Sequence, residues 1–450
     1  MTRPPAKLLM SARFIEFSLA IAVIASLFHL VEVLRLSGFL PAPFVYDVSD
    51  TFMDWFNPAY WSHNPGAYEV WNSVYAPLSF VILRIVGAPA CYANAPKDAR
   101  DCDLIGIVAI LVIYAACAVA AAIVFYRRDR ATAVFRSVGF GLGLPLLYGL
   151  ERGNLIMIAL FAFILLFGEM LKSRRAVALA AAVLINLKSY LLLPVLAFAV
   201  KREWRTLELC GFAAVGLYLA TVVIVGGGTP FELIDNLKIW FNAMSGVVWD
   251  QVLYSPTYAP FLQFDERQYP IRDFIPQRTV DVAKLLIEIE LVASRSLAFL
   301  CIACSWLYPR AITTQRLVLF VIMQSFVAQN PGGYAMTFVI FLVFMERWDG
   351  PCTGLAIVMA YLLSIPADML IGNFYVYERE SWLGGRLVES TYGMSVGALV
   401  RPGLFALILW LLGIDSLIRF HRAARTSRAN FGLAGEQLPS APPAAATTAS

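Results

Sequence analysis

The chain has 450 residues, of which 60% are hydrophobic and 15% charged, and its net charge is +4 at pH 7. Water-soluble domains carry about 25% charged residues, so this composition excludes a soluble protein of the same length. The small net charge, spread along the chain, argues against a nucleic-acid-binding protein, and 3 histidines are too few to favour a zinc site or a His-based triad.

Long apolar runs begin near the N-terminus and recur along the chain. Residues 14–34, 104–125 and 353–370 approach or exceed the ~20 residues that a helix needs to cross the hydrocarbon core. They lack the polar–apolar alternation of strands in a membrane β-barrel. The first run is longer than the apolar part of a signal peptide, and no small-residue cleavage site follows it, so we expect a retained anchor.

Basic clusters predict which loops face the cytoplasm, because Lys and Arg are retained on that side. Between successive clusters the chain must cross the membrane an even number of times. We therefore divide 176–200 into two short helices that meet near 188–194. For the same reason we expect 75–88 to be an interfacial helix that does not cross. The prediction is an all-α polytopic membrane protein with about twelve crossings. The crossings are 14–35, 104–125, 135–149, 154–171, 176–188, 190–200, 206–226, 291–308, 317–329, 334–346, 352–370 and 402–419.

Both termini lie inside in this arrangement, and residues 1–428 form one transmembrane bundle. Its external segments are a first loop at 36–103 and two further loops at 227–290 and 371–401. Residues 429–450 are rich in Ala, Pro, Ser and Thr, so we expect a disordered cytoplasmic tail there.

The first external loop combines acidic residues with aromatic rings. Asp47, Asp50 and Asp54 stand among tryptophans, tyrosines and phenylalanines that include Trp55 and Tyr75. Rings with a polar edge suit stacking against sugars, and a carboxylate among them can take a proton from a hydroxyl group. The alternative is an aromatic belt at the membrane interface with solvated acids.

The segment GLERGN (149–154) places an ionisable pair between two predicted helices. Glu151 and Arg152 lie at the outer membrane edge, where charged groups are costly and usually face a cavity or a partner. The planar guanidinium of Arg152 can bind a phosphate, and Glu151 and Asn154 can bind sugar hydroxyls. The alternative is a Glu–Arg pair that only caps the helix junction.

Two further outward turns carry candidate ligand-binding residues. Lys188 lies at the apex of the 176–200 helix pair, where it can hold an anionic headgroup; the alternative is a lysine that snorkels to the interface. Asn330, in the segment QNPGGY, can hydrogen-bond a ligand, and the alternative is a plain turn. Cys91 and Cys102 bracket a polar stretch, which fits either a disulfide or two free thiols.

The motifs of the first half of the chain occur in a defined order. An acidic aromatic loop follows the first helix, and after it come SVYAPL, ERGN at the start of a helix, and LKSYLLLP with KREWR behind it. This order resembles the GT-C superfamily of membrane glycosyltransferases over residues 1–205. It is most similar to glycosyltransferase family 87, which includes mycobacterial polyprenol-phosphate-mannose-dependent mannosyltransferases.

The resemblance implies that a sugar, mannose or similar, moves with inversion from a polyprenyl-phosphate donor to a lipid or glycan hydroxyl. The reaction would take place on the periplasmic face of a bacterial inner membrane, without a nucleotide sugar, a metal or another cofactor. The segment MDWFN puts Asp54 at the place of the family's presumed base, with Asp50 as the second candidate. Lys188 matches a lysine that precedes Tyr-Pro in the family, although the proline here is delayed to Pro194.

These residues define one hypothesis and two alternatives. In the hypothesis Asp54 deprotonates the acceptor hydroxyl while Arg152 and Lys188 hold the donor phosphate. One alternative is an O-antigen ligase or polymerase that uses a lipid-pyrophosphate donor. The other is a lipid or sugar transporter without chemistry, which requires polar residues inside the membrane; the residues that fit it are Glu208, Arg295 and Asp368.

Overall fold

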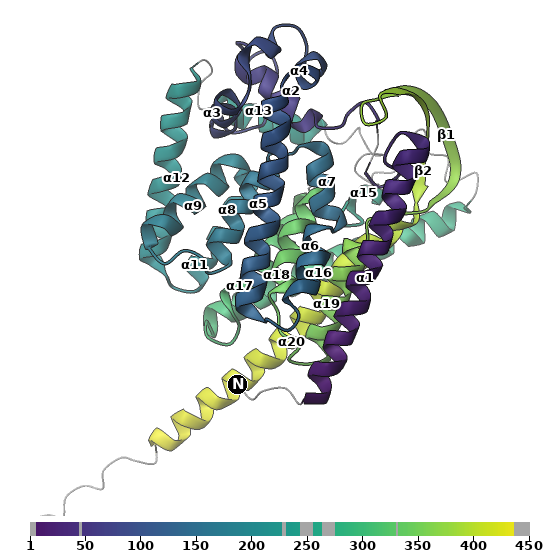
Figure 1. Ribbon diagram of the computed structural model, residues 1–450. Coiled ribbons are helices and arrows are strands. Elements are labelled where there is room, and N and C mark those ends of the chain that lie inside the picture. The colour runs from purple at the N-terminus through teal and green to yellow at the C-terminus, as the bar shows by residue number, and fades with distance from the viewer. Residues whose placement is uncertain are drawn as a thin grey trace, which may run out of the picture.

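The computed structural model describes residues 6–44, 47–226, 231–243, 255–262, 275–329 and 332–435. The chain is mostly helical, and its long helices pack into a bundle (Figure 1). Within the described ranges, 5 helical segments are long and apolar enough to cross a membrane: Ala12–Ser37, Leu104–Arg128, Ala133–Arg152, Trp204–Val225 and Val396–Thr426. Their length and composition agree with a membrane protein.

The helices and strands follow one another as labelled in Figure 1. The first half of the chain forms α1 (Ala6–Ser37), α2 (Met53–His63), α3 (Pro77–Val86), α4 (Pro96–Cys102), α5 (Leu104–Arg128), α6 (Ala133–Gly141), α7 (Leu144–Arg152), α8 (Ile156–Phe167), α9 (Arg174–Leu187), α10 (Leu192–Val195), α11 (Ala197–Val200) and α12 (Trp204–Val225). The second half forms α13 (Glu232–Ala243), α15 (Ala259–Leu262), α16 (Gln277–Leu307), α17 (Thr314–Gln329), α18 (Met336–Phe344), α19 (Pro351–Ser364), β1 (Leu370–Ser381), β2 (Arg386–Ser395) and α20 (Val396–Gly435).

The helices differ in what covers them. Helices α1, α5 and α12 expose large apolar side chains such as Phe28, Val112 and Val223, and an apolar surface of this extent requires lipid as its solvent. Helices α8, α17 and α18 are enclosed by other helices and supply much of the main hydrophobic core. The core therefore lies in the middle of the bundle, inside a shell of lipid-facing helices.

Several helices are interrupted inside the bundle. Helices α6 and α7 are separated at residues 142–143, and the stretch 176–200 divides at Lys188. After α9 the chain forms a 3₁₀ turn at Ser189–Leu191 and then the short helices α10 and α11. Interrupted helices free backbone polar groups at membrane depth, which is tolerated only inside protein or around a cavity. This feature makes the ends of α7 and α9 suitable places for a site.

The first loop folds into α2, α3 and α4, which lie at the top of Figure 1, opposite the end where α1 begins. Helix α3 coincides with the interfacial helix predicted at 75–88. Cys91 and Cys102, left open by the sequence, form a disulfide with Cα atoms 5.5 Å apart. This disulfide closes the loop that contains α4.

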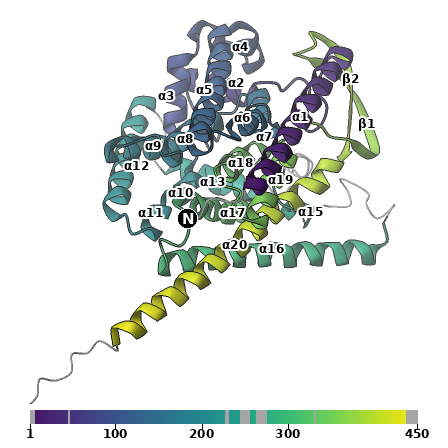
Figure 2. The same cartoon turned by 60° about the horizontal axis from the view of Figure 1, so that its bottom comes forward.

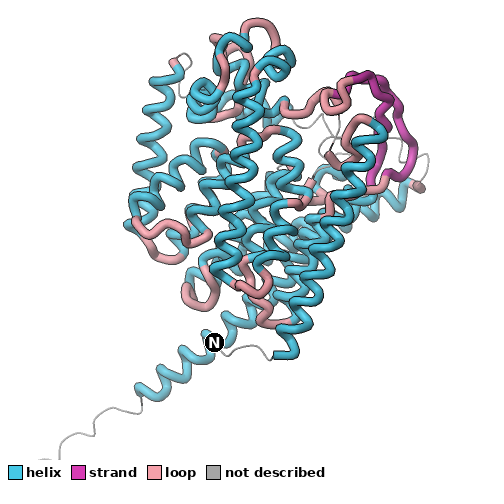
Figure 3. Tube along the Cα trace, viewed as in Figure 1, coloured by secondary structure: helices cyan, strands magenta, loops and turns pink. Residues whose placement is uncertain are grey.

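A β-hairpin occupies most of the segment 371–401, which was predicted to be a loop in an all-α protein, and α20 begins within the same segment, at Val396. Strands β1 and β2 pair antiparallel from Leu370 opposite Ser395 to Ser381 opposite Arg386. Figure 3 shows the hairpin beside the C-terminal end of α1. Aromatic and β-branched residues at 374–376 and 391–392 favour strands, but these stretches are too short to form an apolar helical run.

Two helices extend beyond the predicted crossings. Helix α16 begins at Gln277 instead of 291, because charged residues such as Lys284 and Glu288 are good helix formers although they lower hydropathy. Helix α20 continues to Gly435 instead of ending at 419, so the predicted disordered tail is helical at its start. The remainder of that tail, 436–450, lies outside the described residues.

The end of the bundle opposite the first loop, called the inner end after the predicted topology, holds a buried ionic network. Arg136 of α6 donates to both carboxylate oxygens of Glu16 in α1 at 2.8 and 2.9 Å, and the two side chains are 1% and 0% exposed. Trp348 and Tyr361 donate to the same carboxylate, while Nη1 of Arg136 donates to the backbone carbonyls of Phe344, the last residue of α18, and of Glu346. Each charge therefore has its partners within the protein.

A second group continues this network toward the C-terminal helix. Arg316 of α17 pairs with Glu346 at 2.5 Å and with Asp415 of α20. Asp415 also accepts from Arg419 at 2.8 Å. Figure 2, in which the inner end comes forward, shows α20 running along this face beside α19. The network ties the helices of both chain ends to the core.

Candidate active site

Four residues singled out in the sequence meet around one guanidinium. Arg152, the last residue of α7, directs Nη1 to Oδ2 of Asp50 at 2.6 Å and Nη2 to Oδ1 of Asp54 at 2.9 Å. Asn154 donates from Nδ2 to the other oxygen of Asp54 at 2.7 Å. The side chains of Arg152, Asp54 and Asp50 are 17%, 22% and 36% exposed, so the cluster opens outward at Asp50.

The ERGN turn takes this shape because a glycine follows the arginine. Gly153 has a φ of +63° and ends α7 in the left-handed conformation. A Cβ atom at this position would lie 3.1 Å from Cβ of Trp55 and 3.2 Å from Cα of Phe52. A residue without a side chain therefore lets the first loop approach the turn, which brings Asp54, in the first turn of α2, to Arg152.

Glu151 supports the first loop from beneath the cluster. Its buried carboxylate accepts from the hydroxyl of Thr51 at 3.1 Å, and its backbone carbonyl accepts from the amide of Phe52 at 2.8 Å. Its second oxygen, Oε2, has no hydrogen-bond partner among the described residues. This location fits support of the loop better than the predicted contact with a sugar.

Lys188 brings a second positive charge to the site. It directly follows α9, and its Nζ lies 4.5 Å from the centre of the Tyr75 ring. Within the described part of the chain its ammonium has no hydrogen bond or ion pair, although its charge acts on Asp54. An ammonium withdrawn from water without a carboxylate contact is costly. An anion at this position would offset that cost.

The two aspartates differ in their electrostatic surroundings. Burial opposes ionisation of Asp54, but Arg152, the Asn154 hydrogen bond and the charge of Lys188 outweigh it and hold the pKa of this carboxyl below its usual value. At Asp50 burial outweighs the attraction of Arg152, and the charges of Asp54 and Asp47 reinforce it, so the pKa is raised. Asp54 is thus an ionised anchor near neutral pH, and Asp50 is the stronger base.

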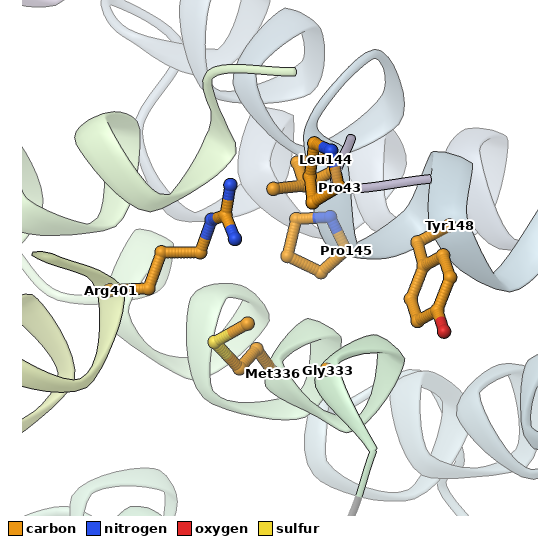
Figure 4. A pocket seen from close by; sticks show the side chains of 7 residues that line it. All are labelled: Pro43, Leu144, Pro145, Tyr148, Gly333, Met336 and Arg401. Atoms are coloured by element: carbon orange, nitrogen blue, oxygen red, sulfur yellow. The ribbon is translucent and has the colours of Figure 1, made fainter. Parts of the chain in front are cut away.

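Two tyrosines that the sequence analysis missed complete the inner side of the cluster. Tyr334 hydrogen-bonds Asn154 and stacks against Tyr148 with ring centres 5.6 Å apart. The sequence signal for Tyr334 was its place at the end of QNPGGY, and Tyr148 lies one helical turn before Arg152. A small pocket beside them is mainly apolar, as Figure 4 shows; it is lined by Pro43, Leu144, Pro145, Tyr148, Gly333, Met336 and Arg401.

The remaining predicted ligand residues are placed differently. Trp55 is buried in the hydrophobic core, so it presents no face to a sugar, contrary to the prediction. Its position in a dense aromatic loop could not distinguish a core ring from an exposed one. The ring of Tyr75 lies against Lys188, and its hydroxyl group is close enough to Asp54 and Arg152 to be affected by their charges. Asn330 lies outside the described residues.

The three residues that fit a transporter have separate surroundings. Asp368 pairs with Arg401 at 2.5 Å, next to the apolar pocket. Arg295 donates to a backbone carbonyl of α17 at 2.8 Å, and Glu208 is exposed on α12. Within the described ranges these three residues form no hydrogen bond or ion pair with one another, so they do not form a cluster like the one around Arg152.

Neither metal-ligand groups nor similarity to known proteins assigns a function to this site. Among the described residues, no group of three or more His, Cys, Asp or Glu side chains is arranged to hold a metal ion. Cys301 and Cys304, spaced as C-x-x-C in α16, have no further ligand of this kind.

The chain matches no protein-family profile, no curated protein and no solved structure. The resemblance to glycosyltransferase family 87 therefore stays a prediction.

Proposed function

We propose that this protein is an inverting glycosyltransferase that moves a sugar from a polyprenyl-phosphate donor to a lipid or glycan hydroxyl. The observation that carries the proposal is the cluster of Asp50, Asp54, Arg152 and Asn154, with Lys188 beside it and without an ion pair to any described residue. Such a cluster combines a base for the acceptor with a cation for a phosphate leaving group. Both are what sugar transfer from a phosphate requires.

Asp50 is the proton acceptor in the proposed mechanism. As the acceptor oxygen bonds to C1 of the sugar, the bond from C1 to the phosphate oxygen breaks and its electron pair leaves with the phosphate. The hydroxyl proton passes to Asp50, which is the more exposed and more basic carboxylate. The resemblance pointed to Asp54, but both oxygens of Asp54 are held by Arg152 and Asn154, so we assign it to anchoring.

Arg152 organises the carboxylates in this proposal, and Lys188 holds the phosphate. Both terminal nitrogens of Arg152 contact aspartates, whereas Lys188 has no anionic contact among the described residues. Lys188 can therefore offset the negative charge that the phosphate gains as the bond breaks. Asp50, Asp54, Arg152 and Lys188 together carry no net charge, so the choice of a polyprenyl-phosphate donor over a lipid-pyrophosphate donor follows from the resemblance to glycosyltransferase family 87.

The proposed arrangement in the membrane has about twelve crossings with both termini in the cytoplasm. The 5 long apolar helices and the shorter apolar helices such as Ile156–Phe167 and Pro351–Ser364 supply the segments. The Cys91–Cys102 disulfide lies in the same loop as Asp50 and Asp54, and disulfides persist in oxidising compartments. This supports a periplasmic site in a bacterial inner membrane.

The test is a transfer assay with purified protein and labelled lipid-linked sugars. Polyprenyl-phosphate and lipid-pyrophosphate donors are supplied side by side, and new glycosidic bonds are detected by mass spectrometry. We expect transfer from the phosphate donor, and Asp50→Asn to lower it about 10²–10⁴-fold. The matched control is Asp98→Asn, an exposed aspartate of the same loop, which leaves the rate unchanged.

Three outcomes would contradict the proposal in different ways. Transfer from the pyrophosphate donor alone favours a ligase or polymerase. Lipid or sugar flux across sealed vesicles without a new glycosidic bond favours a transporter. Full activity of Asp50→Asn together with loss of activity in Asp54→Asn moves the role of base to Asp54.

A further inference from the structure

Arg100 of α4 is a buried charge that the proposed mechanism does not use. Its side chain is 5% exposed, and Nη1 donates to the backbone carbonyls of Ser49 at 2.7 Å and Thr51 at 3.0 Å. These two carbonyls belong to the residues on either side of Asp50. A buried guanidinium usually requires a close carboxylate, but its carboxylate contact, with the exposed Asp101, is 3.3 Å long.

Segments distant in the sequence hold Arg100 in this place. The ring of Trp382, at the end of β1, lies over the guanidinium with its centre 5.2 Å from Cζ. The indole nitrogen of Trp382 donates to Asp101 at 2.9 Å, and its ring packs against Phe52 with centres 5.2 Å apart. The Cys91–Cys102 disulfide closes the loop that carries Arg100. The hairpin and the disulfide loop therefore meet at this arginine.

The backbone around Asp50 is held from two sides. Arg100 binds the carbonyls of Ser49 and Thr51, and Glu151 binds the hydroxyl of Thr51 and the amide of Phe52. The carboxylate of Asp50 has one ion-pair contact, with Arg152, so the position of Asp50 depends more on its backbone than that of Asp54 does.

We propose that Arg100 is a positioning residue: by binding the carbonyls of Ser49 and Thr51 it fixes the Asp50 carboxylate for proton transfer. Its effect on rate rests on the proposed function, whereas its effect on the loop does not. Displacement of a reacting group by about 1 Å costs up to 10²-fold in rate. Loss of Arg100 therefore changes kcat and its pH dependence more than it changes donor binding.

The test compares Arg100→Gln and Arg100→Lys with Arg84→Gln. Arg84 of α3 is a matched control, because it also donates to backbone carbonyls on this side of the protein, those of Ser62 and Val225. We expect Arg100→Gln to lower kcat about 10- to 100-fold with the donor KM within about twofold. Arg100→Lys, which keeps the positive charge, recovers part of this loss, and Arg84→Gln leaves kcat unchanged.

The pH profile separates positioning from general support. Burial raises the pKa of Asp50 and Arg152 lowers it, and both influences depend on where the loop holds the carboxyl, so a loosened loop changes that pKa. The acid limb of kcat/KM in Arg100→Gln then moves. An unmoved limb, or a change in KM alone, overturns the role of Arg100.

Hydrogen exchange tests the same role without any substrate. The amides of Asp50 and Met53 are bonded within this loop and the amide of Phe52 to the carbonyl of Glu151, so all three exchange faster in Arg100→Gln and not in Arg84→Gln. If the wild-type protein transfers no sugar but exchange responds to Arg100, the proposed function fails and the fixing of the loop stands. If transfer proceeds and both exchange and kcat are unchanged in Arg100→Gln, the positioning role fails.

Discussion

The two ends of the bundle each place an arginine among acidic groups, but they complete its surroundings differently. At the inner end Arg136 and Glu16 are fully buried, and each has several further hydrogen bonds from the protein. At the outer end Arg152 joins two partly exposed aspartates. Beside it Lys188 has no anionic contact and one oxygen of Glu151 has no partner among the described residues.

This difference separates structural support from chemistry. A buried network in which every group is bonded gains nothing from a ligand and stabilises one arrangement of helices. An incomplete network contains groups whose desolvation cost a ligand can offset. The same substitution is therefore expected to lower activity at Arg152 and to lower stability at Arg136.

Arg152→Met is expected to have the largest effect on activity. It leaves Asp50 and Asp54 without their shared cation, and the carboxylate of Asp50 is no longer held in position. Transfer therefore falls about 10³-fold. Both carboxylates are partly exposed and can be solvated, so the melting temperature of the purified protein changes little. The measurement is kcat/KM together with thermal unfolding, and a large loss of stability with normal specific activity would make the outer cluster structural.

Arg136→Met is expected to act in the opposite way. Removing one partner of a buried pair leaves the carboxylate of Glu16 uncompensated and costs about 3–5 kcal/mol of unfolding free energy. The molecules that remain folded transfer sugar at the wild-type rate. Replacing both partners, in Glu16→Leu/Arg136→Met, recovers much of the stability, because no buried charge is left alone. Reduced specific activity with unchanged stability would contradict the structural role.

The outer cluster was easier to predict from the sequence than the inner one. Glu151, Arg152 and Lys188 are ionisable residues within or between apolar runs, where a charge is conspicuous because of its cost. Arg136, in contrast, belongs to the basic clusters that set the predicted topology, at the start of the predicted crossing 135–149. Its partner Glu16 is 120 residues away, and no local pattern reveals that the two side chains meet in the core.

Long-range pairing also explains the other differences. Hydropathy predicted the long lipid-facing helices, because lipid exposure is a property of each segment alone. Trp382 meets Arg100 and Phe52 only through the hairpin, which pairs Leu370–Ser381 with Arg386–Ser395. Trp55 was predicted to bind a sugar because its ring lies in an acidic loop, whereas the fold directs it into the core.

Lys188→Gln tests the incomplete part of the outer cluster. A hydrogen bond to a charged group contributes about 1.5–3 kcal/mol, so kcat/KM for the phosphate donor falls about 10- to 100-fold. The matched control is Lys238→Gln, an exposed lysine paired with Asp235 on α13, which leaves transfer unchanged. Equal effects of the two variants would remove Lys188 from the donor site.

The pH profile sharpens the distinction between the two aspartates. Protonated Asp50 cannot accept a proton, so kcat/KM falls as the pH drops through its pKa, which lies above the usual 3.8. Asp54→Asn removes a neighbouring negative charge that raises this pKa and leaves Arg152 to Asp50, so the acid limb of the residual activity moves to lower pH. A limb that moves to higher pH, or an unmoved one, would contradict Asp50 as the base.

Removal of the disulfide is expected to give the smallest change in rate. Labelling of its cysteines shows on which side of the membrane the first loop lies. Cys91→Ser/Cys102→Ser lowers kcat several-fold, because Trp382 still holds Arg100 when the loop around α4 is no longer closed. In intact spheroplasts a membrane-impermeant maleimide labels Cys91 and Cys102 after mild reduction, while Cys352, at the start of α19 near the inner network, is labelled only after permeabilisation. The reverse pattern would place Asp50 in the cytoplasm, away from lipid-linked sugars of the periplasmic leaflet.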